Sequence, residues 1–157
     1  MASIDPELAA RVWQRVRPGE EPPREPAQKT ALSALIAREQ EQAELFRQLS
    51  ARTTGQQGLF ALLFRQARGR AACLRGIELL RGGGGHAPAP AKPWEDRPMA
   101  AILGSCYGRS LEAMAEYDVR ADDPEYGAVF AGLAKQVREQ CRTILEILGE
   151  LCSPGRT

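Results

Sequence analysis

The side chains of this chain that could do chemistry are few: four cysteines, a single histidine and carboxylates at helical spacing. No two cysteines are spaced Cys-x-x-Cys, the pattern typical of zinc and thioredoxin-like sites. The simplest interpretation is a set of free, buried thiols: Cys73, Cys106, Cys141 and Cys152. A redox role through thiols is an alternative, because Cys73 lies one turn beyond Arg70, and a nearby arginine could lower a thiol pKa. Cys141 directly follows Gln140 and shares this alternative.

Arg70 is the most unusual of the charged residues. It lies in LLFRQARGRAACLRGIELL, residues 62–80, where the apolar spacing of a helix directs it into the stripe between Leu63 and Leu74. Either its guanidinium reaches water along its apolar stem, or it is buried and must be compensated by a carboxylate.

Gly- and Pro-rich stretches at 17–28 and 81–98 divide the chain. Apolar periodicity predicts helices over 29–50, 57–81, 98–120 and 124–151, and a short amphipathic helix over 5–16 that packs Trp13 on the bundle. Few residues are β-branched, and no segment alternates with period two, so a sheet is not expected. The predicted organisation is an N-terminal segment (1–28), a helical domain (29–152) and a tail (153–157).

The order of these helices predicts an all-α, ferritin-like four-helix bundle. Two helical hairpins are joined by one long crossover, the linker 81–98. We expect this linker to span the length of the bundle, with the third helix beginning beside the first and running parallel to it.

The predicted inward faces are each interrupted by one polar residue near mid-length. An offset of about 70 residues superimposes the first hairpin on the second, as expected for degenerate copies of one unit. The faces are Leu32, Ile36, Glu39, Ala43 and Phe46; Phe60, Leu63, Ala67, Arg70, Leu74 and Ile77; Leu103, Tyr107, Ser110, Met114 and Tyr117; and Phe130, Leu133, Val137, Gln140, Ile144, Ile147 and Leu151.

Several stretches resemble the rubrerythrin-like branch of the ferritin-like superfamily, over roughly residues 30–151. They are ALIAREQEQAELF, AACLRGI, CYGRSLEAMAEY and DPEYGAVFAGLAKQVREQCRTILEILG, and bacterial ferritin-like proteins also begin with a VWQRV-type segment. The resemblance implies a duplicated hairpin in which Glu and Glu-x-x-His hold two iron ions, and hence peroxide reduction or iron oxidation. Carboxylate and imidazole ligands suit iron or manganese, and i, i+3 spacing places both on one helix face.

Five of the six ligand positions implied by the resemblance are substituted. Glu39, seven residues before Phe46, matches the family, whereas Ser110, seven before Tyr117, does not. The Glu-x-x-His positions fall on Ala67 and Arg70 in the second helix and on Val137 and Gln140 in the fourth. The only histidine of the chain, His86, lies in the Gly/Pro linker. Six helical carboxylates lie off the inward faces and are expected to face solvent: Glu41, Glu44, Glu112, Glu116, Glu139 and Glu146.

We therefore expect Glu39, Arg70, Ser110 and Gln140 to form a closed polar layer in place of two metal ions, with Ala67 and Val137 filling the space of two lost carboxylates. The favoured function is a non-catalytic structural or partner-binding module without a cofactor. The alternative is a rubrerythrin-type di-iron protein acting in peroxide reduction or iron and oxidative-stress handling, which would hold iron or manganese.

Charge and hydropathy limit the partners. Lys plus Arg number 21 against 20 Asp plus Glu, without a basic cluster, so nucleic-acid binding is not expected. The chain has no run of about 18 apolar residues and no apolar signal core, which predicts no membrane contact and a cytoplasmic location. Dimerisation through a helix face or through the Trp13 helix stays open.

Overall fold

The structure, a computed structural model, describes residues 31–83 and 92–152. These residues form four helices, and no strand occurs among them. The predicted all-α bundle of four helices is therefore confirmed. The short helix predicted over 5–16 lies outside the described residues.

The four helices are α2 (Leu32–Arg52), α3 (Gln57–Leu80), α4 (Met99–Arg120) and α5 (Gly127–Leu151). The predicted boundaries hold to within three residues at every end. The largest differences are at the starts of α2 and α5, each of which begins three residues later than predicted.

The late start of α5 has a local cause in the turn before it. Asp123 Oδ1 accepts hydrogen bonds from the backbone N–H groups of Glu125 and Tyr126, at 2.9 and 2.8 Å, so this side chain caps a turn ahead of the helix. A Cβ on Gly127 would lie 2.4 Å from the carbonyl oxygen of Ala121, which explains glycine at the first helical position.

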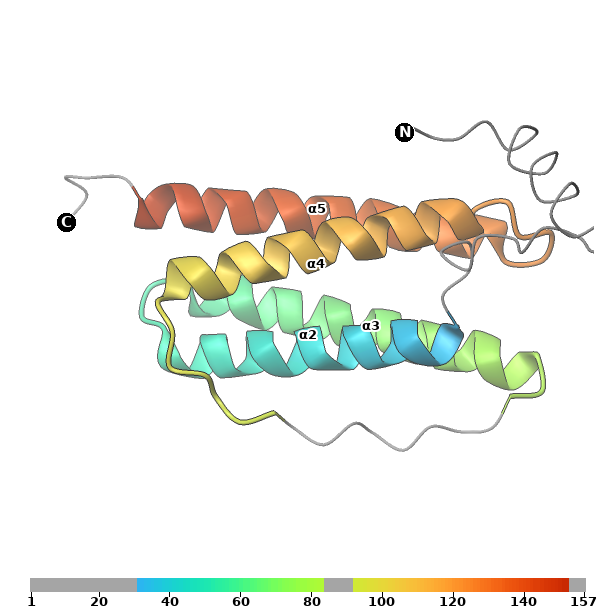
Figure 1. Ribbon diagram of the computed structural model, residues 1–157, viewed down its shortest axis with the longest axis horizontal. Coiled ribbons are helices and arrows are strands. Elements are labelled where there is room, and N and C mark those ends of the chain that lie inside the picture. Colours follow the sequence, from blue (N-terminus) through green and yellow to red (C-terminus); the bar gives the residue numbers. More distant parts are fainter. Residues whose placement is uncertain (1–30, 84–91, 153–157) are drawn as a thin grey trace, which may run out of the picture.

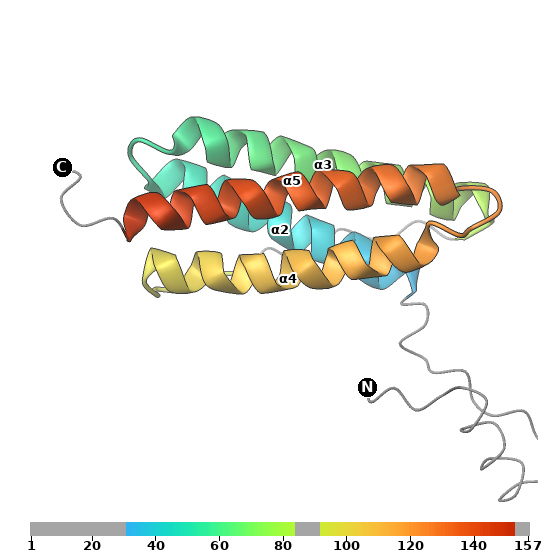
Figure 2. The same cartoon turned by 90° about the horizontal axis from the view of Figure 1, so that it is seen from above.

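Each hairpin is a closely packed antiparallel pair, α2 with α3 and α4 with α5, and contacts between the hairpins are sparser (Figures 1 and 2). The prediction that the third helix runs parallel to the first is wrong. α4 begins at the end of the bundle where α2 ends and runs parallel to α3. A linker of this length can reach either end of a bundle, so its length does not determine the direction of the next helix.

The interior contains two apolar clusters. One gathers side chains from the end where α4 begins: Ala43, Phe46, Leu49, Phe60, Leu63, Ala67, Ile102, Leu103, Cys106, Ile144 and Ile147. The other gathers side chains from the opposite end: Leu35, Ile36, Leu74, Ile77, Ala113, Tyr117, Phe130, Leu133, Ala134 and Val137. Between these clusters lie the polar residues that interrupt the four inward faces.

Most of the predicted inward residues are buried, with one clear exception. Leu151, predicted to extend the inward face of α5, is 47% exposed because it is the last residue of the helix. Among residues 31–83 and 92–152, no helix combines the length and the hydrophobicity needed to span a membrane.

Candidate functional site

The candidate site is a layer of polar side chains at the middle of the bundle, with one residue from each helix. Glu39 of α2, Arg70 of α3, Ser110 of α4 and Gln140 of α5 are each at most 2% exposed. The structure thus brings together the four polar residues that interrupt the inward faces. Their helices place them at one level because each lies near the middle of its apolar stripe.

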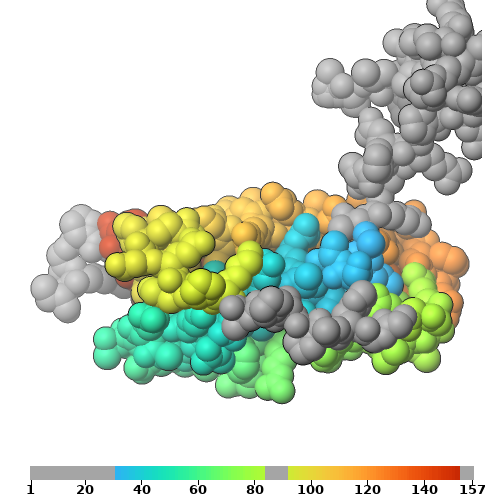
Figure 3. Space-filling view, turned by 60° about the horizontal axis from the view of Figure 1, so that its bottom comes forward, coloured from blue at the N-terminus to red at the C-terminus, as the bar shows by residue number. Residues whose placement is uncertain are grey.

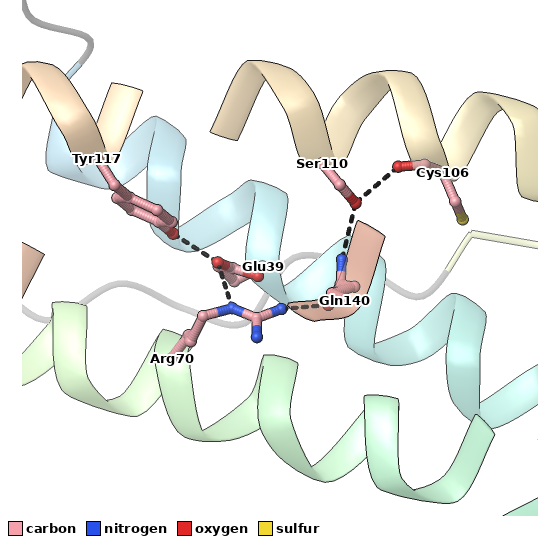
Figure 4. A network of polar contacts seen from close by, with 6 residues as sticks. All are labelled: Glu39, Arg70, Cys106, Ser110, Tyr117 and Gln140. Atoms are coloured by element: carbon pink, nitrogen blue, oxygen red, sulfur yellow. Dashed lines mark hydrogen bonds and ion pairs between the residues drawn. The ribbon is translucent and has the colours of Figure 1, made fainter. Parts of the chain in front are cut away.

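Arg70 and Glu39 form a buried ion pair at the centre of this layer. Arg70 Nε donates to Glu39 Oε2 at 2.8 Å, and Arg70 Nη2 donates to Gln140 Oε1 at 2.5 Å. The guanidinium therefore lies between a carboxylate on one side and an amide on the other (Figure 4). The alternative that Arg70 extends to water does not hold.

Hydrogen-bond donation continues from Arg70 through Gln140 and Ser110 to the backbone of Cys106. Gln140 Nε2 donates to Ser110 Oγ at 2.8 Å, and Ser110 Oγ donates to the backbone carbonyl oxygen of Cys106 at 2.8 Å (Figure 4). Gln140 and Ser110 each accept one of these hydrogen bonds and donate another. The expected closed layer is incomplete at one atom, because Arg70 Nη1 is buried without a hydrogen-bond partner among the described residues.

Tyr117 of α4 is a fifth member that the sequence placed on the inward face but did not connect to the layer. Its hydroxyl donates to Glu39 Oε2 at 2.5 Å, the same oxygen that accepts from Arg70. Burial, and secondarily the negative charge of Glu39, raises the pKa of Tyr117 well above its usual range. The phenol therefore stays protonated and remains a donor to the carboxylate.

The other two positions that the resemblance implies as ligand positions are apolar and buried. Ala67 belongs to one apolar cluster and Val137 to the other, so they lie on either side of the layer, with exposures of 0% and 1%.

The residues in this layer do not fit a di-metal centre. One carboxylate is present, and Glu39 Oε2 already accepts two hydrogen bonds, from Arg70 and Tyr117. A guanidinium lies beside that carboxylate, and its positive charge opposes a divalent cation. Within the described part of the chain, no three His, Cys, Asp or Glu side chains are grouped where they could hold a metal ion.

The expectation of four buried thiols holds for Cys106 and Cys141 but not for Cys73, which is half-buried, or for Cys152, which is exposed just past the end of α5. Burial raises the pKa of Cys141 by more than the positive charges of Arg138 and Arg70 lower it, which does not favour the alternative of a redox role for this thiol. Burial also raises the pKa of Cys106 to about 12. Both side chains therefore remain protonated thiols near neutral pH, where a nucleophilic cysteine needs its thiolate.

Some polar residues near the layer were not placed correctly by helical spacing. Gln42, one turn beyond Glu39, is 4% exposed but was absent from the predicted inward face. Neither atom of its side-chain amide has a hydrogen-bond partner among the described residues. Glu41 and Glu44, predicted to face solvent, are only half-exposed, with side-chain exposures of 31% and 26%.

Comparison of the chain with protein-family models, with curated proteins and with solved structures gave no match.

Proposed function

We propose that this chain is a ferritin-like bundle of the rubrerythrin-like branch in which an internal ion pair stands in place of the di-metal centre. On this proposal it acts as a non-catalytic structural or partner-binding module. The observation that carries the proposal is the Arg70 guanidinium, which is 1% exposed and bonded to both Glu39 and Gln140.

The arrangement of the helices supports the family part of the proposal. The parallel directions of α3 and α4 are those of two hairpins joined by one long crossover. The degenerate ligand positions of all four helices also lie at or beside one level of the bundle. The proposed architecture includes the crossover at 81–98 and the N-terminal helix at 5–16.

Charge compensation supports the non-catalytic part of the proposal. A carboxylate buried without a partner is strongly unfavourable, and a di-metal protein meets this requirement with its cations. Here Arg70 neutralises Glu39 from within the chain, and Tyr117 donates a further hydrogen bond. The bundle therefore has no need of a metal to fold, unlike domains whose folding energy comes from metal ligation.

The test is metal content and metal-dependent stability of the full chain. Protein purified from iron-supplemented cells should carry no stoichiometric iron or manganese, and EDTA or added ferrous or manganous ion should leave its melting temperature unchanged. It should oxidise ferrous ion and reduce peroxide no faster than a protein-free control. About two irons per chain, the content of a di-iron site, or a melting temperature raised by added metal, would overturn the proposal.

A variant in which the metal ligands of the family are restored tests separately whether these six positions correspond to the ligand positions of that family. Ser110→Glu, Ala67→Glu, Arg70→His, Val137→Glu and Gln140→His together complete the six family ligands around Glu39. We expect this variant to bind iron or manganese and to lose helical structure on chelation, because its buried carboxylates then lack a counter-charge. A variant that is folded and indifferent to metal would show that these positions do not form a metal cage.

A further inference from the structure

A cavity of about 550 Å³ lies between α2, α4 and the segment 92–98, outside the polar layer. In the space-filling view, this segment lies between the surface of α2 and the start of α4 (Figure 3). The volume of the cavity is within the range of small-molecule sites, about 300–1,000 Å³. Neither the ion pair at the centre of the bundle nor the proposed structural role accounts for it.

One part of the cavity wall is apolar and belongs to the bundle core. Leu45, Trp94, Ile102 and Cys106 line it. Ile102 and Cys106 are buried members of an apolar cluster, and Leu45 and Trp94 pack against that cluster. An aromatic ring and aliphatic side chains supported by the core make a preformed surface for a flat or extended apolar group.

Two of the three carboxylates in the wall, Glu41 and Glu44, are less exposed than the cations that neutralise them, whereas the third, Glu95, is 68% exposed and pairs with Arg97, which is 45% exposed. Glu41 of α2 pairs with Lys92 Nζ at 3.4 Å and with Arg109 Nη1 at 3.2 Å. The side chain of Glu41 is 31% exposed, whereas those of Lys92 and Arg109 are 64% and 50% exposed. The two cations can therefore move into solvent at little cost, while the carboxylate stays in the wall.

A second carboxylate on the same helix face repeats this asymmetry. Glu44 lies three residues beyond Glu41 and is 26% exposed, and its partner, Arg47 of the same helix, is 54% exposed. Arg47 does not line the cavity, whereas Glu44 does. The least mobile charges facing the cavity are therefore negative.

Trp94 already takes part in a contact with a cation. The guanidinium of Arg52, which does not line the cavity, lies over its ring, 4.3 Å from the centroid. Indole is the strongest cation–π acceptor among the aromatic side chains.

We propose that this cavity binds a small organic cation with an apolar body, such as an arylalkyl amine. Its ammonium group replaces Lys92 and Arg109 at Glu41, and its apolar part packs against Trp94, Leu45 and Ile102. In the free protein, Lys92 and Arg109 act as internal stand-ins for this cation. The site goes beyond the proposed structural role and does not depend on the polar layer.

The test uses three probes that share one ring system and differ in charge: 1-naphthylmethylamine, 1-naphthylmethanol and 1-naphthoate. Binding to the full chain is followed by amide chemical shifts and calorimetry. The amine should bind with shifts centred on residues 92–109 and at least about tenfold more tightly than the alcohol or the acid, a free-energy difference of about 1.4 kcal/mol. Glu41→Gln should weaken the amine about tenfold, and Glu146→Gln, on the exposed face of α5, should not.

A second variant should change the affinity for the amine in the opposite direction. Lys92→Gln with Arg109→Gln removes the internal competitors of the ligand, so the amine should bind more tightly than it does to the unaltered chain. This variant keeps Glu41 and separates the proposal from a general loss of structure. Equal binding of the three probes, preference for the acid, absence of saturable amine binding, or weaker amine binding to the double variant would each overturn the proposal.

Discussion

Glu39 and Glu41 are two residues apart on α2, each pairs with an arginine, and the two pairs have opposite physical character. Glu39 and Arg70 are 2.8 Å apart with side chains 2% and 0% exposed, whereas Glu41 and Arg109 are 3.2 Å apart with side chains 31% and 50% exposed. In the interior, each charge depends on the other and on fixed hydrogen bonds. At the cavity, water can replace either partner, so the pair is exchangeable.

The difference shows why one pair fixes the fold and the other leaves room for a ligand. Removing a charge from a buried pair leaves its partner desolvated and unpaired, which costs far more than the pair contributes relative to an apolar replacement. Removing one member of an exposed pair lets the other be hydrated. The same helix thus carries a structural carboxylate and an exchangeable one on different faces.

The largest expected effect comes from removing one charge of the buried pair. Glu39→Leu and Arg70→Met should each lower the free energy of unfolding by about 3–5 kcal/mol. Chemical denaturation monitored by circular dichroism measures it, with Glu146→Leu as an exposed control. A loss no larger than that of the control would mean that Glu39 and Arg70 behave as a solvent-exposed ion pair.

A smaller loss is expected when Tyr117 no longer donates to Glu39. Tyr117→Phe keeps the ring in its apolar cluster and removes the hydrogen bond to a buried carboxylate, which is worth about 1.5–3 kcal/mol. The denaturation midpoint should fall with an unchanged dependence on denaturant concentration. No loss would mean that Arg70 alone satisfies Glu39.

The loss of stability expected at Asp123, at the end of the bundle, is intermediate. This side chain forms an ion pair with Arg81 and also caps the turn before α5. Hydrogen bonds from the backbone of Tyr126, then Arg81, hold the pKa of Asp123 far below its usual range. Because the folded-state pKa is lowered, the carboxylate stabilises the fold fully above the ordinary aspartate pKa, about 3.9, and this stabilisation is lost as the pH falls below it.

Asp123→Asn isolates the charge, since an amide oxygen can still accept from the backbone of the turn. The variant should melt at a lower temperature than the unaltered chain at neutral pH, and the difference should shrink toward strongly acidic pH. A difference in melting temperature that is the same at all pH values would assign the effect to the cap alone.

The smallest expected effect is at the cavity. Glu41→Gln or Arg109→Gln should change the free energy of unfolding by at most about 1 kcal/mol, the range of solvent-exposed ion pairs. High salt should reduce even this difference, because exposed charges are screened. A loss comparable to that of Glu39→Leu would contradict the contrast between the two faces of α2.

Helical spacing in the sequence was sufficient to find the four helices and the polar residues at their centre. Glu39, Arg70, Ser110 and Gln140 each interrupt an otherwise apolar stripe, and such interruptions are visible because burying a polar group requires partners. The spacing could not show which partners meet. Tyr117 lies two turns from Ser110 on α4 and reaches Glu39 only through the length of its side chain.

Features that depend on the irregular segments were not predictable in the same way. Trp94 and Lys92 lie in a Pro-rich stretch without periodicity, so nothing in the sequence indicated that they close a cavity against α2. Gln42 was missed because α2 buries a wider face than one stripe. The direction of α4 was wrong because spacing identifies the face of a helix and carries no information on its polarity in the bundle.

The central claim, that Glu39 and Arg70 compensate each other within a sealed interior, is tested most directly by a double-mutant cycle. The free energies of unfolding of the unaltered chain, Glu39→Leu, Arg70→Met and the double variant give the coupling energy. We expect the double variant to recover most of the loss seen in each single variant, because two apolar side chains can fill the layer without an unpaired charge. The coupling energy should lie well above the roughly 0–1 kcal/mol of exposed pairs. Single effects that simply add would contradict the account.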